Sequence, residues 1–229
     1  MSDPVAEVRF DAARRERLGL PEAVLADVKS PGQLAEAVRQ AFDSGGPVLV
    51  TRMSEQQYAA LPDQYRSRLD YDLVSRTALA SDCLPLAGAA VEVGVLTAGS
   101  ADVPVAREAI RTLACHGYAC VEINDVGVAG LWRVMEHRET LVRLPVLIVC
   151  AGMEGALFSV IAGLVPGVVI AVPTSTGYGV AAGGRAALHA ALASCAPGVA
   201  VSNVDNGYGA ACLAIRVLSG GGTGIRCGD

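Results

Sequence analysis

The strongest constraint in this sequence is a regular alternation, beginning at residue 91, of apolar runs rich in β-branched residues with segments of helical length. The runs span residues 91–97, 118–124, 145–151, 167–173 and 198–204. Strands that alternate with helices form a parallel sheet, and a run that is apolar throughout is typical of a strand covered on both faces. The sequence therefore predicts an α/β fold, a three-layer αβα arrangement around a doubly wound parallel sheet of the flavodoxin or Rossmann type.

The first ninety residues lack this alternation and predict a smaller α+β region. Helices are expected at residues 11–18, from the N-cap Ser30 to about Ser44, and after Ser54, with a strand at 47–51. Charge drops and long apolar runs begin near residue 88, which marks a domain boundary. We expect an N-terminal region at 1–88, a catalytic domain at 89–218 and a flexible, glycine-rich tail at 219–229.

Composition excludes several classes of function. The formal net charge is −5, and no run of Lys or Arg could follow a nucleic-acid backbone. No apolar stretch approaches the roughly 20 residues that cross a bilayer, and the N-terminus is acidic where a signal peptide would be apolar. We therefore expect a cytoplasmic protein with no nucleic-acid or membrane partner.

The seven cysteines form no CxxC pair and no His/Cys spacing that would gather four zinc ligands. Their odd number and apolar surroundings favour reduced thiols, most of them buried. A structural metal site is not expected.

Small, polar and acidic residues collect directly after the apolar runs. In a doubly wound sheet, ligands bind in the crevice beyond the carboxyl ends of the strands. Any one strand-to-helix loop needs glycines and helix caps, but five such loops at one edge indicate a binding site. The candidate substrate-binding residues are Thr97, Gly99, Ser100, Asp102, Asp125, Gly152, Met153, Thr174, Gly177, Asp205 and Asn206.

The loop at residues 97–106 is the best candidate for binding a phosphate. Gly99 permits a close turn, and either Ser100 or Asp102 is expected at the N-cap of the following helix, whose free N–H groups and dipole would favour an anion. The loop matches neither GxGxxG nor the P-loop pattern, so NAD(P) and ATP sites of those kinds are disfavoured.

Glu154 and Cys195 are the candidate catalytic residues. Glu154 follows the third run and begins a helix, so its carboxylate either pairs with the helix dipole or faces the crevice as a general base. Cys195 lies on a turn, where a thiolate could act as a nucleophile. Because that turn precedes the fifth strand, Cys195 is expected at the amino edge of its own sheet, and a neighbouring subunit would have to bring it to a crevice.

Several of these segments resemble known families. Residues 93–106 are similar to the phosphate loop shared by the PurE carboxyaminoimidazole ribonucleotide mutases and LarB. The segments at 125–130, 151–156, 172–179, 194–199 and 203–210 resemble LarB specifically, as do residues 11–24, Lys29 and residues 48–52 near the N-terminus. The resemblance covers nearly the whole chain and implies a PurE-like second domain.

A LarB-type enzyme carboxylates the pyridinium ring of nicotinic acid adenine dinucleotide with CO2 as co-substrate. It also hydrolyses the phosphoanhydride, which gives pyridinium-3,5-biscarboxylic acid mononucleotide and AMP for nickel-pincer cofactor biosynthesis. By their positions in the motifs, Cys195 resembles the nucleophile and Glu154 the base or orienting carboxylate. Ser100 and Asp102 would hold the ribose phosphate. No tightly bound cofactor is implied, although Mg2+ could assist anhydride cleavage.

Two positions depart from the expected LarB pattern: Trp132 stands where His is expected, and Phe158 where Pro is expected. A PurE-type mutase and a non-catalytic nucleotide-binding protein therefore stay as alternatives. The Ala/Gly-rich segments at 180–193 and 210–218, together with the PurE resemblance, favour a homo-oligomer such as an octamer.

Overall fold

The computed structural model describes residues 7–80 and 90–220, so most of the expected tail at 219–229 lies outside the described residues. The described chain divides into two compact units, the first mainly residues 7–80 and the second mainly residues 90–113 and 118–220. None of the described helices is long and apolar enough to span a membrane.

The first unit is a small α+β structure built on a four-stranded sheet. Its strands are β1 (Val24–Leu25), β2 (Leu49–Thr51), β3 (Leu69–Asp72) and β4 (Thr77–Ala80), in the order β1-β2-β4-β3. Strands β1 and β2 are parallel and the other pairs are antiparallel. The helices are α2 (Arg14–Leu18), α3 (Pro31–Asp43), α4 (Glu55–Ala59) and α5 (Asp63–Arg66).

Helices α3 and α4 start where the sequence predicts, because each has a reciprocal cap. The Ser30 hydroxyl accepts the backbone N–H of Gln33, whose side chain accepts the N–H of Ser30. Ser54 and Gln57 repeat this capping box at the start of α4. Each box satisfies two backbone donors that a helix end leaves unpaired.

The second unit contains a five-stranded parallel sheet with the order β6-β5-β7-β8-β9. The strands are β5 (Val91–Thr97), β6 (Ala119–Ile123), β7 (Val146–Ala151), β8 (Val168–Pro173) and β9 (Val199–Val201). The helices are α6 (Val103–Cys115), α7 (Leu131–Glu136), α8 (Arg138–Leu141), α9 (Ala156–Ala162), α10 (Arg185–Leu192) and α11 (Gly207–Ser219). All five predicted strands and the parallel, doubly wound α/β fold are confirmed.

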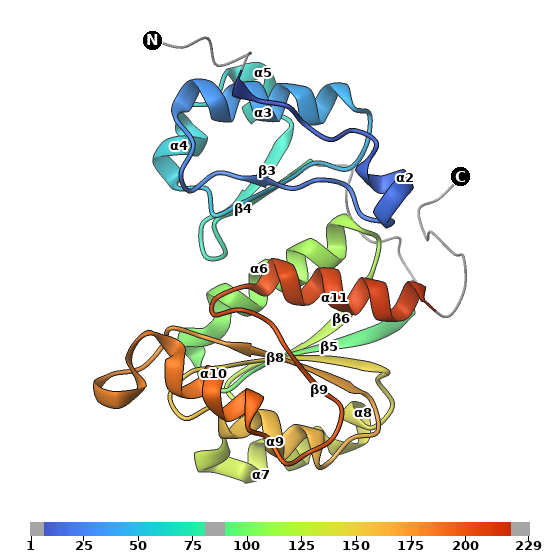
Figure 1. Ribbon diagram of the computed structural model, residues 1–229, viewed down its shortest axis with the longest axis vertical. Coiled ribbons are helices and arrows are strands. Elements are labelled where there is room, and N and C mark those ends of the chain that lie inside the picture. The colour runs from blue at the N-terminus through green and yellow to red at the C-terminus, as the bar shows by residue number, and fades with distance from the viewer. Residues whose placement is uncertain (1–6, 81–89, 221–229) are drawn as a thin grey trace. The chain divides into compact units, whose positions relative to one another are not determined.

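The sheet lies between two layers of helices, with α6 and α11 on one face and α7 to α10 on the other (Figure 1). Strand β7 is buried at every position, as its continuous apolarity predicts. The core on the α7–α10 face gathers residues of alternating strand positions, such as Leu147 and Val149, around Phe158 and Ile161.

Two expectations about helices in the second unit are corrected. Helix α10 begins at Arg185 rather than near residue 180, because Gly179–Gly184 forms an irregular 3-10 segment interrupted by non-helical backbone at Ala182 and Gly183. Helix α11 does not offer its small residues to another copy of the chain: Ala210, Ala211 and Ala214 are fully buried, and α11 contacts β7 and β8.

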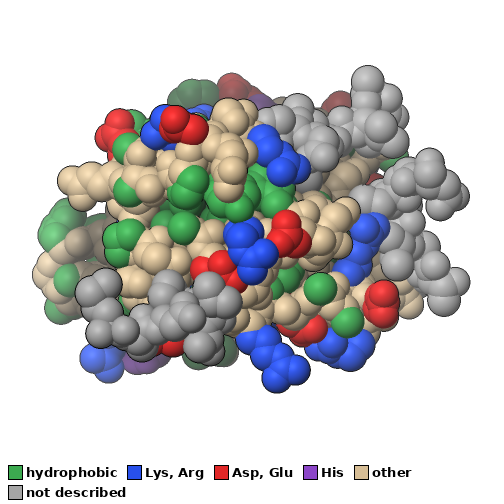
Figure 2. Space-filling view, turned by 90° about the horizontal axis from the view of Figure 1, so that it is seen from above, with side chains coloured by type: hydrophobic (Ala, Val, Ile, Leu, Met, Phe, Trp, Pro, Cys, Tyr) green, Lys and Arg blue, Asp and Glu red, His purple; other side chains and the backbone are tan. Residues whose placement is uncertain are grey.

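The exposed surface mixes residue types. Figure 2 shows hydrophobic side chains gathered near the middle of one face, with acidic and basic side chains beside them. This mixed pattern agrees with the scattered charges of the sequence and shows no continuous basic stripe on the face in view.

Helices α6 and α11 approach closely at Gly207. A Cβ atom there would lie 2.2 Å from the backbone oxygen of Val105. We predict that Gly207→Ala lowers the free energy of unfolding by about 1–3 kcal/mol, because the two helices would have to separate. The measurement is the urea midpoint of the full chain.

Gly163→Ala is the matched control, because its Cβ would meet its nearest neighbour at 3.4 Å and the backbone there is right-handed. It should change stability by no more than about 0.5 kcal/mol. Equal midpoints for the two variants would contradict the close approach of α6 and α11.

Candidate functional site

The candidate substrate-binding residues lie on the five loops that leave the carboxyl ends of β5 to β9. Because the strands are parallel, these loops emerge at one edge of the sheet in the order of the strands. Thr97 is the last residue of β5, Gly99, Ser100 and Asp102 follow that strand, and Asp125 follows β6. Gly152 and Met153 follow β7, Thr174 and Gly177 follow β8, and Asp205 and Asn206 follow β9.

Hydrogen bonds tie the loops at the two sides of this edge. At the β6 side, the backbone N–H of Asp125 donates to the Thr97 hydroxyl at 2.9 Å. At the β9 side, the backbone N–H of Ser175 donates to the Asp205 carboxylate at 2.8 Å. These hydrogen bonds constrain the backbones of the loops.

The central loops are joined as well. The backbone N–H of Met153 donates to the carbonyl of Thr176 at 2.9 Å. Gly152 permits this approach, because a Cβ atom at that position would lie 2.1 Å from the same Thr176 oxygen. The loops after β7 and β8 therefore form one packed surface.

Asp102 links β5 to β8. It is 2% exposed, and its two carboxylate oxygens accept from the Gly99 backbone N–H at 2.9 Å and from the Thr174 hydroxyl at 2.6 Å. Gly99 is the N-cap of a 3-10 turn at Ser100–Asp102, and this turn leads directly into α6 at Val103. Asp102 reaches back to Gly99 from the third residue of the turn, so its carboxylate positions two loops, while Ser100 stays exposed.

Backbone conformation distinguishes the same edge. Five non-glycine residues in the described chain have a positive φ, and three of them are Asp125 at 57°, Met153 at 51° and Asp205 at 52°. Each lies on a loop at the carboxyl edge. Left-handed backbone at non-glycine residues is uncommon and gathers at functional sites. This concentration supports the edge as the binding site.

Acidic side chains border the edge. Asp125 is exposed and forms an ion pair with Arg133 of α7 at 2.7 Å. Glu154 is exposed and directly precedes Gly155, the N-cap of α9. It makes no hydrogen bond or ion pair with the described residues, so its carboxylate is accessible to a ligand.

Asn206 and Gly177 have local structural roles at this edge. The Asn206 side chain caps α11 by accepting the backbone N–H of Gly209 at 2.8 Å. A Cβ atom on Gly177 would lie 2.7 Å from the backbone oxygen of Ala181. Both residues shape loops of the edge, which agrees with the expectation that strand-to-helix loops need helix caps and glycines.

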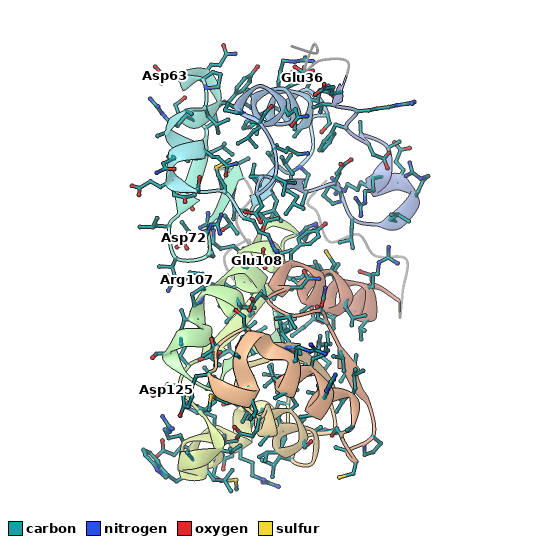
Figure 3. The ribbon with its side chains drawn as sticks, turned by 60° about the vertical axis from the view of Figure 1, so that its left-hand side comes forward. Glu36, Asp63, Asp72, Arg107, Glu108 and Asp125 are labelled. Atoms are coloured by element: carbon teal, nitrogen blue, oxygen red, sulfur yellow. The ribbon has the colours of Figure 1, made fainter. Side chains whose placement is uncertain are left out.

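Two buried groups lie behind this edge: Glu108, which sequence reasoning missed, and Cys150, one of the cysteines in the apolar segments where buried thiols are expected. Glu108 of α6, labelled in Figure 3, accepts the backbone N–H of Tyr208 at 3.1 Å and thereby stabilises the start of α11. Cys150, near the end of β7, is fully buried, and burial together with the charges of Asp102, Glu108 and Asp205 raises the pKa of its thiol well above the usual value. Cys150 is consequently a poor nucleophile.

Cys195 lies at the other edge of the sheet. It is exposed, and it sits in the turn between α10 and β9, four residues before the start of β9 at Val199. Val199, the first residue of β9, pairs with Val169, the second residue of β8. The turn that contains Cys195 therefore lies at the amino edge of the sheet. The chain therefore does not bring Cys195 together with Glu154 or Ser100 through its own sheet.

The two positions that depart from the expected LarB pattern have different environments. Phe158 is fully buried in the core beneath α9, away from solvent. Trp132 is 65% exposed on α7, which follows the loop that contains Asp125. Trp132 is thus the departure that could affect a ligand, whereas Phe158 is a packing residue.

Metal ligands do not gather in the described chain: among residues 7–80 and 90–220, no group of three or more His, Cys, Asp or Glu side chains could hold a metal ion.

Comparison with known proteins places both units in families. Residues 92–226 match the family model for AIR carboxylase, and residues 3–82 match the model for the LarB/PurE-like N-terminal domain. An uncharacterized protein of Methanocaldococcus jannaschii is 36% identical over 215 residues, which cover 90% of this chain and 82% of that protein. A crystal structure of a substituted Treponema denticola PurE2 covers 57% of this chain and 81% of its own, with 24% identity and a TM-score of 0.47.

The second unit is therefore a PurE-like domain of the AIR carboxylase class, which makes the protein a carboxylase-related enzyme. The preceding unit narrows this class, since it matches the LarB/PurE-like N-terminal domain. The chain belongs to the LarB family, with the two-domain architecture that the sequence resemblance predicts.

The environments of the cysteines predict their reactivity. Under native conditions Cys195 should react with a maleimide much faster than Cys115 or Cys150, because it is exposed and they are buried. Burial and the charge of Glu122 raise the pKa of Cys120 to about 11. Labelling of Cys120 should therefore rise about tenfold per pH unit between pH 7 and 10.

Peptide mass mapping of briefly labelled protein measures these rates, and Cys195→Ser should remove the fast reaction. Modification of Cys150 as fast as that of Cys195, in protein whose unfolding midpoint is normal, would contradict the assignment.

Proposed function

We propose that this protein is a pyridinium-3,5-biscarboxylic acid mononucleotide synthase. It would carboxylate nicotinic acid adenine dinucleotide with CO2, hydrolyse the phosphoanhydride and release AMP, as a step of nickel-pincer cofactor biosynthesis. The observation that carries the proposal is the carboxyl edge of the β5–β9 sheet, where an exposed Ser100 and an exposed Glu154 border pre-formed loops. Membership of the LarB family supports this choice of substrate.

The chemistry requires one nucleophile and one base. A pyridinium ring is too electron-poor to attack CO2. Addition of a thiolate to the ring forms a carbon–sulfur bond and gives a dihydropyridine whose remaining meta carbon has enamine character. That carbon attacks CO2, a base removes its proton, and expulsion of the thiolate restores aromaticity.

Residues of this chain can be matched to those roles. Cys195 would supply the thiolate, since it is exposed and the deeply buried Cys150 is unsuited. Glu154 would accept the proton, and the exposed hydroxyl of Ser100 would bind the ribose-phosphate portion. Asp102 would act indirectly, because both of its oxygens already hold the loops.

A second copy of the chain would complete the site. Cys195 and Glu154 lie at opposite edges of one sheet, so a neighbouring subunit would have to present its Cys195 at the carboxyl edge. We accordingly propose a homo-oligomer, for which an octamer is one arrangement. Exposed apolar side chains that a second copy could cover include Trp132, Tyr178 and the fully exposed Val180.

Mg2+ would bind mainly through the substrate phosphates, where its charge would assist anhydride cleavage. The carboxylation steps above need no metal ligand from the protein. A reduced Cys195 suits the cytoplasm, which is where we place the activity.

We predict that the purified protein converts nicotinic acid adenine dinucleotide and bicarbonate into AMP and the biscarboxylated mononucleotide. Cys195→Ala should abolish the biscarboxylated product, and Glu154→Gln should slow its formation by about 10²–10⁴-fold, the usual contribution of a general base. Cys120→Ala is the matched thiol control and should retain activity. Chromatography with mass detection measures both products.

Two experimental outcomes would contradict this proposal and favour an alternative function. Turnover of aminoimidazole ribonucleotides, without either expected product, would identify a PurE-type mutase, which the AIR carboxylase match favours. Saturable binding of the dinucleotide with no turnover of either substrate would identify a nucleotide-binding protein.

A further inference from the structure

The basic residues of this chain are almost all arginine. Seventeen of the 18 basic side chains are Arg, and the single lysine is Lys29. Lysine differs from arginine in carrying a compact point charge with three donors on a flexible stem. Lys29 is therefore a distinctive position in the first unit, and the proposed carboxylation does not use it.

Lys29 lines a cavity of about 480 Å³ within the first unit. The walls come from three segments: residues 7–10, residues 22–29 around β1, and the first turns of α3. Apolar side chains such as Phe10, Val24 and Ala37 form much of the lining. The volume is within the range that holds small-molecule ligands.

The charged side chains that line the cavity differ in whether they already have hydrogen-bond partners. The Glu7 carboxylate accepts from the Gln33 side chain at 2.8 Å, and the Glu22 carboxylate accepts from the Asp11 backbone N–H at 2.7 Å. The half-buried Lys29 ammonium has no hydrogen bond or ion pair with residues 7–80 or 90–220. The exposed Arg9 also lines the cavity, so the side-chain donors available there, Lys29 and Arg9, are both cations.

The backbone holds Lys29 in place. Its N–H donates to the carbonyl of Ala26 at 3.0 Å, and the Gln57 side chain donates to the same carbonyl at 2.8 Å. Lys29 directly precedes Ser30, the N-cap of α3, and the first turn of that helix has no acidic residue. The Lys29 charge and the positive end of the helix dipole repel each other. An anion bound between them would be attracted to both.

We propose that this cavity binds a small organic anion, with its carboxylate or phosphate on Lys29 and an apolar ring or chain against Phe10 and Val24. Part of the ligand would bury apolar surface, and Lys29 would neutralise the charged end. This site belongs to the first unit alone and is independent of the proposed carboxylation.

The single lysine makes the test direct. Protein labelled with 13C-lysine gives one side-chain εCH2 signal, which comes from Lys29, so binding at this cavity is observed separately from binding at any other site. The probes are benzoate, phenyl phosphate and inorganic phosphate. We expect benzoate or phenyl phosphate to shift the signal in a saturable way, and inorganic phosphate to bind at least about tenfold more weakly because it lacks the apolar part.

Ala23→Leu narrows the cavity while keeping the lysine, and it should weaken the organic anion by about tenfold or more. Ala12→Leu, at an exposed position outside the lining, is the control and should leave the affinity unchanged. Three results would overturn the proposal: no saturable shift with either organic anion in the native protein, equal affinity for inorganic phosphate, which would indicate an adventitious ion only, or equal binding by both variants. No outcome depends on turnover, so failure of the carboxylase assay would not affect this test.

Discussion

A buried carboxylate holds the carboxyl edge of the second unit together. In the sheet order, β7 lies between β5 and β8, and Asp102 reaches from the β5 loop to the Thr174 hydroxyl after β8 at 2.6 Å. Its other oxygen closes the turn at Gly99. Hydrogen bonds to charged groups are among the stronger ones, about 1.5–3 kcal/mol, and a buried carboxylate left without them would be costly. The arrangement of the neighbouring loops depends on this link.

The same arrangement separates groups that must react from groups that must not. Ser100 and Glu154 are exposed at the edge, whereas Thr97, Asp102 and Cys150 are buried beneath it. Burial, together with the nearby negative charges, raises the pKa of the Cys150 thiol, which leaves the exposed Cys195 as the more suitable nucleophile. Since Cys195 lies at the opposite edge of its own sheet, the proposed chemistry would require a second copy of the chain.

Sequence patterns predicted the elements better than their ends and contacts. Apolar runs identified β5 to β9, and the continuous apolarity of β7 reflects a strand that is covered on both faces. The hairpin β3–β4 escaped prediction because each of its strands has only four residues, which is too short for a clear apolar–polar period. Tertiary contacts such as the stacking of Tyr58 on Tyr71 at 4.6 Å support it. The sequence predicted that the loops after the strands lie together at one edge of the sheet. The positive φ of Asp125, Met153 and Asp205 and the reach of Asp102 to Thr174 follow from three-dimensional packing that no local pattern contains.

The claim that two copies of the chain complete one site is tested most directly by complementation. Differently tagged Cys195→Ala and Glu154→Gln chains are co-expressed, and oligomers that contain both are purified through the two tags in succession. If each site takes Cys195 from one copy and Glu154 from another, random mixing regenerates intact sites at about one quarter of positions, and carboxylation returns to about a quarter of the native rate. Mixed oligomers as inactive as the Cys195→Ala parent, or a native protein that is monomeric and fully active, would contradict the account.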